Sequence, residues 1–299
     1  MKKFIVVILM AATSVFAQTA GNSGLAFLKL GFGARNIAMG DLGVTGTGDV
    51  TSAYYNPALV TKNGNFQVII SHNELIQDTR SELLGAGFRL FDIPFTFALN
   101  TTNISGFEVR TKPGPAESTF SVHYFWSSLS TGYQLMENLS VGATFKYIFE
   151  GLYSDEATGY GLDFGAHYEG IIEGLNVGAS IRNLGSMSKL RNEKTKLPVD
   201  FRFGASYFLP VENFKTDVTL VGGLQKYTAT DDMHFNVGTE LLYDNLIAVR
   251  GGFITGYESK GLTLGAGICW NNINFDYAFL PYKYGLNDSH IISLMYSFN

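Results

Sequence analysis

Residues Leu139–Phe149 read LSVGATFKYIF, in which Ser140, Gly142, Thr144 and Lys146 alternate with apolar side chains. Side chains point alternately to the two faces of a β-strand, so this segment has one apolar face and one small or polar face. The same alternation recurs in later segments, at 160–168, 199–207, 262–270 and 273–279. From about residue 65 onward, the sequence is therefore predicted to be all-β.

The length of these strands separates a membrane barrel from a soluble sandwich, in which strands also alternate. They extend over roughly 10 to 14 residues, whereas strands in globular sheets are usually about five or six residues long. A tilted transmembrane strand needs ~9–11 residues plus its ends, which fits. Tyr, Trp and Phe recur near the strand ends, as expected of aromatic girdles at the two membrane surfaces.

The connections between strands also favour a barrel. The expected strands are 65–75, 81–90, 93–104, 119–135, 139–152, 157–169, 174–184, 197–209, 213–228, 233–243, 246–256, 261–271, 273–281 and 288–298. Tight turns, such as Phe91-Asp92 and Asp244-Asn245, alternate with loops of five to fourteen residues, the longest at 105–118 and 185–196. Because lipid offers a strand edge no hydrogen-bond partner, such a sheet must close. We therefore predict a transmembrane antiparallel β-barrel of about fourteen strands.

The N-terminus is typical of an export signal. Two lysines precede the apolar or small-residue stretch Phe4–Phe16, and Val15-Phe16-Ala17 offers a small–x–small cleavage pattern. The stretch is too short for a membrane-spanning helix, which needs about 20 residues. Residues 1–17 are therefore expected to be a signal peptide that is cleaved before Gln18, and the mature chain is expected in the bacterial outer membrane.

Residues 18–64 do not alternate. They are rich in Gly and contain one helical candidate near Ser52–Leu59, which Pro57 interrupts. A barrel of fourteen strands encloses a lumen too wide for its own side chains to fill. We therefore expect residues 18–64 to form a hatch or plug inside the lumen of a barrel that comprises residues 65–299.

Several short strings resemble a known family. In the N-terminal part these are Phe27-Leu28-Lys29-Leu30-Gly31, Gly33-Ala34-Arg35, Ala38-Met39-Gly40 and Tyr55-Asn56-Pro57-Ala58. In the barrel they are Arg182-Asn183-Leu184-Gly185, Leu197-Pro198 and Phe275-Asp276-Tyr277-Ala278-Phe279. In their order and spacing they are similar to the PorV/PorQ family of outer-membrane barrels, which are related to the FadL fatty-acid transporters. The resemblance covers almost the whole mature chain.

This resemblance implies a fourteen-strand barrel with an N-terminal hatch and a link to type IX protein secretion. The partners it implies are a secretion translocon and exported cargo proteins, beside the lipid of the outer membrane. The first hypothesis is thus an accessory protein of type IX secretion. The alternative is a FadL-like channel for uptake of hydrophobic small molecules, and a purely structural barrel is a third. A kinked wall and an apolar pocket under the hatch would favour transport, whereas a sealed lumen with an apolar mouth would favour secretion.

Charged residues in the lumen are the candidate site residues. A buried charge is tolerable only when it is paired, so Arg35 is expected to anchor the hatch by binding a lumen carboxylate or backbone. Asp41 and Asp49 follow it, and Asn56-Pro57 is expected to end the hatch because Pro cannot donate to a strand ladder. Five charged residues have lumen-facing parity: Lys146, Asp163, Arg182, Arg202 and Asp276.

No enzymatic, cofactor or metal site is predicted. The G-x-G strings lack the strand–turn–helix context of a nucleotide site. The five His residues do not cluster with metal-ligand spacing, and Cys269 is the only Cys. A net charge of -5, spread along the chain, argues against nucleic acid as a partner. Charged residues make up 16% of the chain, below the roughly 25% of soluble domains, which also fits a membrane protein.

Overall fold

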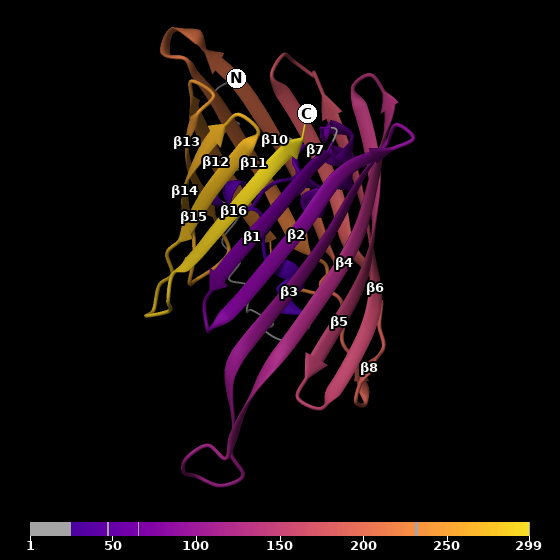
Figure 1. Ribbon diagram of the computed structural model, residues 1–299, viewed down its shortest axis with the longest axis vertical. Helices are drawn as coiled ribbons and strands as arrows, with labels where there is room; N and C mark the ends of the chain where they lie inside the picture. The colour runs from indigo at the N-terminus through magenta and orange to yellow at the C-terminus, as the bar shows by residue number, and fades with distance from the viewer. Residues whose placement is uncertain (1–24, 47, 65, 231–232, 299) are drawn as a thin grey trace, which may run out of the picture.

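The chain forms a closed antiparallel β-barrel of fourteen strands (Figure 1), which confirms the predicted fold class. The structure is a computed structural model that describes residues 25–46, 48–64, 66–230 and 233–298. The predicted signal peptide and its cleavage point lie outside these described residues. None of the helices in the described ranges is long and apolar enough to cross a membrane.

Each barrel strand pairs with its neighbours along the chain, and β1 pairs with β16 to close the barrel. The barrel strands are β1 (Phe66–Leu75), β2 (Thr79–Leu90), β3 (Ile93–Val109), β4 (Ser118–Met136), β5 (Leu139–Leu152), β6 (Asp155–Glu169), β7 (Leu175–Met187), β10 (Asp200–Val211), β11 (Thr216–Tyr227), β12 (Met233–Tyr243), β13 (Ile247–Ile254), β14 (Leu262–Trp270), β15 (Ile273–Leu280) and β16 (Ser289–Phe298). A separate two-stranded hairpin, β8 (Lys189–Leu190) and β9 (Glu193–Lys194), lies between β7 and β10.

The two ends of the barrel differ in their connections. At one end, called the short-turn end, tight turns such as Phe91-Asp92 and Asp244-Asn245 join the strands, with positive φ at both residues. Positive φ at both positions gives the turn geometry that matches the twist of two antiparallel strands. These turns confirm the prediction. The opposite end, called the long-loop end, carries the longest connections.

Several predicted loops are shorter in the structure. Strands β3 and β4 extend as a hairpin beyond the rest of the barrel (Figure 1), so the predicted loop 105–118 shrinks to residues 110–117. Two further connections, at 76–78 and 153–154, are shorter than the predicted five to fourteen residues because β2 and β6 begin earlier than expected. The predicted loop 185–196 contains the β8–β9 hairpin.

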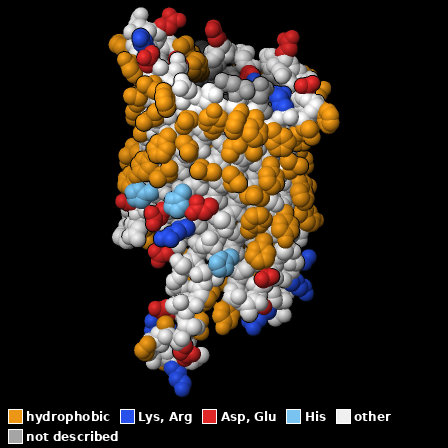
Figure 2. Space-filling model, viewed as in Figure 1, with side chains coloured by type: hydrophobic (Ala, Val, Ile, Leu, Met, Phe, Trp, Pro, Cys, Tyr) orange, Lys and Arg blue, Asp and Glu red, His pale blue; other side chains and the backbone are white. Residues whose placement is uncertain are grey.

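The outer face of the barrel is an apolar belt. Figure 2 shows orange side chains over most of the visible wall, with His and charged groups gathered below them. Phe145 and Trp270 are 53% and 62% exposed, whereas Lys146, which follows Phe145 in β5, is 1% exposed and points inward. The alternation in the sequence thus separates a lipid-facing surface from the lumen, as a transmembrane barrel requires.

An arginine on this belt should block assembly. Phe145 lies in the middle of β5 and faces outward. Phe145→Arg should cost ~2–4 kcal/mol because it puts a charge near the bilayer midplane. Tyr133→Arg, also outward-facing but close to the end of β4, is the matched control and should assemble normally. Folded protein is measured by the heat-modifiable gel shift, and equal yields of the two variants would contradict the lipid-facing assignment.

The described part of the N-terminus, residues 25–64 without 47, is called the N-terminal segment. It contains the short helices η2 (Ala26–Lys29), α1 (Ala34–Ala38), α2 (Ser52–Tyr55) and η3 (Pro57–Lys62). Its hydrogen bonds reach inward-facing groups on widely spaced strands, including Ser293 on β16, Asn236 on β12 and the Ala166 carbonyl on β6. The segment therefore lies inside the barrel, where the indigo ribbon is visible in Figure 1.

Candidate lumen site

Asn56 and Pro57 hold the N-terminal segment against the wall. The Asn56 amide nitrogen donates to the carbonyls of Val44 and Ala166, at 2.9 and 3.0 Å. Its side-chain oxygen accepts from the Ala58 N–H at 3.1 Å and caps η3, which Pro57 begins. The wall has Gly142 at the contact because a Cβ there would overlap the Pro57 carbonyl. The start of η3, the helix that precedes β1, is thus held by contacts with the rest of the segment and with the wall.

Arg35 lies in a chain of alternating charges. Its guanidinium donates to both carboxylate oxygens of Glu240 on β12, at 2.8 and 2.5 Å. Arg250 on β13 donates to the same carboxylate at 2.5 Å and to Asp276 at 2.6 Å. Paired guanidinium–carboxylate contacts of this kind are stronger and more directional than single hydrogen bonds. Through Arg35, the chain joins the segment to β12, β13 and β15.

The two acidic residues downstream of Arg35 do not pair with it directly. The Asp41 carboxylate accepts from the Tyr55 hydroxyl at 2.7 Å. The Asp49 carboxylate accepts from the Thr51 hydroxyl at 2.5 Å and from the Ser52 N–H at 2.9 Å. Both carboxylates therefore fold the segment on itself, next to α2.

A second charged cluster lies on β7 and β10. Arg182 donates to both carboxylate oxygens of Asp200, at 3.0 and 2.9 Å, and Arg202 donates to the same carboxylate at 2.9 Å. One further donor of each arginine binds the segment: Arg182 donates to the Tyr54 carbonyl at 2.9 Å and Arg202 to the Asp41 carbonyl at 3.1 Å. All three charged side chains are at most 1% exposed. One carboxylate thus serves two buried cations that also hold the segment.

A bulge between β6 and β7 places Asn183 beside a third group of charges in the lumen, Lys146 and Asp163. The register shifts between Leu162 and Phe164, and Asn183 has φ of 61°. Arg182 and Asn183 therefore both point inward, although consecutive strand residues normally face opposite sides. Lys146 lies 2.6 Å from Asp163 and 3.0 Å from the Asn183 side-chain oxygen.

Aromatic side chains fill the lumen toward the long-loop end. Phe27 of the segment stacks on Tyr124 with ring centroids 4.5 Å apart, and Phe32 and Tyr54 both pack against Trp126. The Tyr54 hydroxyl donates to the Leu28 carbonyl at 2.7 Å. Burial raises the pKa of Tyr54 to about 12, so the hydroxyl stays a donor at neutral pH. Segment and wall form one apolar core here.

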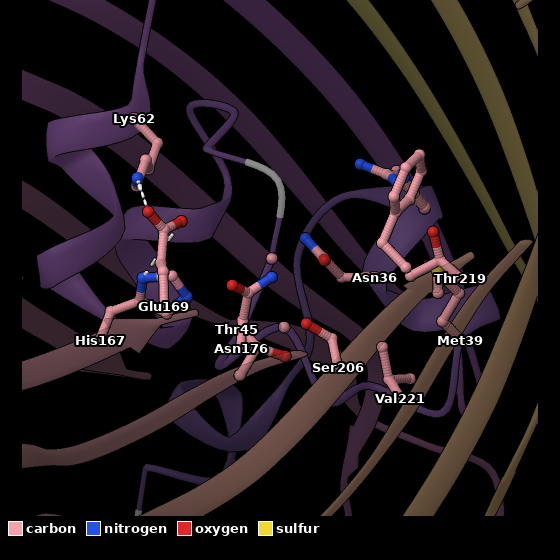
Figure 3. A pocket seen from close by; sticks show the side chains of 14 residues that line it. Asn36, Met39, Thr45, Lys62, His167, Glu169, Asn176, Ser206, Thr219 and Val221 are labelled. Carbon is pink, nitrogen blue, oxygen red and sulfur yellow. Dashed lines mark hydrogen bonds and ion pairs between the residues drawn. The ribbon is translucent and has the colours of Figure 1, made fainter. Parts of the chain in front are cut away.

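A cavity of about 220 Å³ lies on the other side of the segment, toward the short-turn end. It is called the vestibule (Figure 3), and its lining comes from the segment and from β6, β7, β10 and β11. Lys62 and Glu169 form an ion pair at one side, while Met39 and Val221 lie at the other. Its walls thus combine polar and apolar groups.

The wall around the lumen is continuous. Among the described strand pairings, register shifts occur only between β3 and β4, β4 and β5, and β6 and β7. On the outer surface, an apolar groove of about 660 Å³ crosses β1 to β4, β15 and β16, and the His72–Glu82 pair lies at its margin. The pairing of β1 with β2 and of β2 with β3 is unbroken behind this groove.

Sequence reasoning did not select the carboxylates and the arginine that complete these clusters. Asp200, Glu240 and Arg250 all have inward parity, as the selected charges do. Their alternation in the strands therefore indicated that these side chains face the lumen. Which charges pair with one another depends on the register between strands. No group of three or more His, Cys, Asp or Glu side chains that could hold a metal ion occurs in the described part of the chain.

Comparisons with known proteins give structural neighbours only. No protein-family model matches the sequence, and no curated protein matches it. The P. putida toluene transporter TodX superimposes with a TM-score of 0.60 at 14% identity, over 90% of this chain and 99% of that chain. The monoaromatic hydrocarbon channel CymD gives a TM-score of 0.58 at 14% identity, over 90% and 98% of the two chains. The chain has the fold of these transport proteins.

Proposed function

We propose that the protein is an outer-membrane channel through which small hydrophobic molecules pass. The observation that carries this proposal is a barrel with an apolar outer face that superimposes on hydrocarbon transporters over 90% of the chain. At 14% identity the likeness concerns the fold, so substrate and location are part of the proposal. No enzymatic activity is proposed.

In this proposal the N-terminal segment acts as the hatch. The aromatic core closes the lumen toward the long-loop end, and the vestibule lies beyond it. The wall is unbroken, so a solute that passes through the lumen requires the segment to move. Several segment–wall hydrogen bonds are accepted by backbone carbonyls of the segment, such as those of Tyr54 and Asp41, and water can replace these donors. The short-turn end then faces the periplasm, as in other bacterial barrels.

Uptake of radiolabelled toluene tests the proposal. Cells that produce the protein should accumulate toluene faster than cells that carry an empty vector, because the outer membrane slows its entry. Uptake of glucose should be the same in both strains, because glucose is polar and does not bind favourably to an aromatic core. Equal toluene uptake at a verified level of folded barrel would refute a transport role.

A role as an accessory protein of type IX secretion is the second candidate. The continuous wall and the aromatic core that fills part of the lumen support this candidate. The hairpin of β3 and β4 also offers a surface beyond the rim, where Phe107 stacks on Phe120 and Tyr153 packs at its edge. Co-purification from mild detergent tests this candidate: a large translocon protein or surface-exported cargo should appear, and bound lipid alone would exclude it.

A further inference from the structure

His167 is a buried side chain with no internal partner. It lies on β6, lines the vestibule and is 2% exposed. Neither ring nitrogen has a hydrogen bond to any described residue. Buried polar side chains nearly always have a partner, which is either protein, water or a ligand. A neutral imidazole offers one donor and one acceptor, and here neither has a partner among the described residues.

The nearest carboxylate does not satisfy the ring. The Glu169 oxygen lies 3.9 Å from His167 Nδ1, which is beyond hydrogen-bonding distance. Glu169 is instead paired with Lys62, which approaches from the N-terminal segment (Figure 3). The two charges at this side of the vestibule therefore neutralise each other, so a bound molecule needs no charge of its own.

Part of the lining opposite His167 is apolar and can hold a compact apolar body. Met39 and Val221 line the side opposite the Lys62–Glu169 pair (Figure 3). Phe208 lines the cavity near the end of β10, where its ring is 44% exposed. A cavity of about 220 Å³ is smaller than the roughly 300–1,000 Å³ of pockets for drug-sized ligands. A molecule the size of one substituted ring fits it.

We infer that the vestibule binds compact, uncharged molecules that carry one hydrogen-bonding group, with that group on His167 and the apolar body against Met39, Val221 and Phe208. This inference rests on the proposed function and deepens it. A site built around a hydrogen bond favours the solute that can make it, since a pure hydrocarbon would leave the imidazole unpaired. The preferred solute is therefore a hydroxylated ring rather than the parent hydrocarbon.

The test compares the dissociation constants of benzyl alcohol and toluene on the purified, full-length protein in detergent. For each variant, the ratio of the two dissociation constants is divided by the same ratio for the wild type. Partition of the two ligands into the micelle cancels in this comparison. His167→Leu should reduce the preference for benzyl alcohol by about 3- to 10-fold, the worth of one hydrogen bond, and leave toluene binding unchanged. His167→Gln retains a donor and an acceptor and should keep most of the preference.

His234→Leu is the matched control because His234 is also buried and inward-facing, but lies on β12 outside the vestibule. It should leave the ratio as in the wild type. An unchanged ratio in His167→Leu, or an equal loss of both ligands, would overturn the inference and leave water as the partner of His167. Failure of toluene uptake in cells with the binding ratio intact would instead refute the proposed transport function alone.

Discussion

Deleting residues 25–50 should leave a barrel that inserts but admits large hydrophilic antibiotics. The deletion removes Phe27 and Phe32 from the aromatic core and removes Arg35 from its charge chain. The buried carboxylates of the wall keep a cationic partner, because Arg250 still bridges Glu240 and Asp276 after Arg35 is lost. The remaining lumen is too wide for the inward side chains of fourteen strands to close.

Vancomycin sensitivity of producing cells measures this effect, and the heat-modifiable gel shift verifies that the shortened protein is folded. Sensitivity should increase strongly in the deletion variant. Arg35→Ala should give a smaller increase, since Glu240 keeps its contact with Arg250 and the aromatic core remains. If the deletion variant folds and the cells stay resistant, the N-terminal segment is not the element that closes the lumen.

Asp200→Leu should destabilise the folded barrel by about 3–5 kcal/mol, the effect of leaving a buried charge unpaired. Asp200 is the only carboxylate that pairs with Arg182 or Arg202 among the described residues, and all three side chains are buried. Its loss leaves two guanidinium groups side by side without a counter-ion. The segment should also loosen, because these arginines hold the Tyr54 and Asp41 carbonyls.

The free energy of unfolding in urea, followed by tryptophan fluorescence in detergent, measures this change. Asp155→Leu is the control: Asp155 and Arg191 lie 3.8 Å apart at the solvent-exposed end of β6, where such pairs contribute little. Asp200→Asn should be less damaging than Asp200→Leu because the amide oxygen still accepts one hydrogen bond. Equal stability of the leucine variants at 200 and 155 would mean that the buried cluster does not support the fold.

Most of the barrel can be predicted from the sequence because lipid on one side and the lumen on the other impose a period of two. Alternation predicts β5 at 139–152 and β12 at 233–243, the bounds that the structure has. It also predicts that Lys146 and Arg202 face inward. The predicted end of β3 at residue 104 was wrong, because the strand continues to Val109. Ser105-Gly106 is typical of a turn, which favoured an earlier end. Beyond the rim, the hairpin is no longer part of the wall, so alternation does not mark its strands.

The candidate site was harder to predict because it depends on which strands meet. Asp200 serves Arg182 since β7 pairs with β10 across the β8–β9 insertion, and no local pattern encodes that register. The bulge that turns Asn183 inward breaks the alternation on which parity rests. The predicted helix near Ser52–Leu59 became α2 and η3, separated at Asn56, because Pro57 disfavours helix in the preceding residue.

A reversible tether between the N-terminal segment and the wall tests the central claim, that this segment moves to open the lumen. A Cβ at position 204 would lie 2.7 Å from Val44 Cγ1, so Val44→Cys with Gly204→Cys approaches the geometry of a disulfide. Cys269→Ser removes the remaining thiol. In the same folded protein, toluene uptake should be low when the tether is oxidised and should recover on reduction. Equal uptake in both states would contradict the claim.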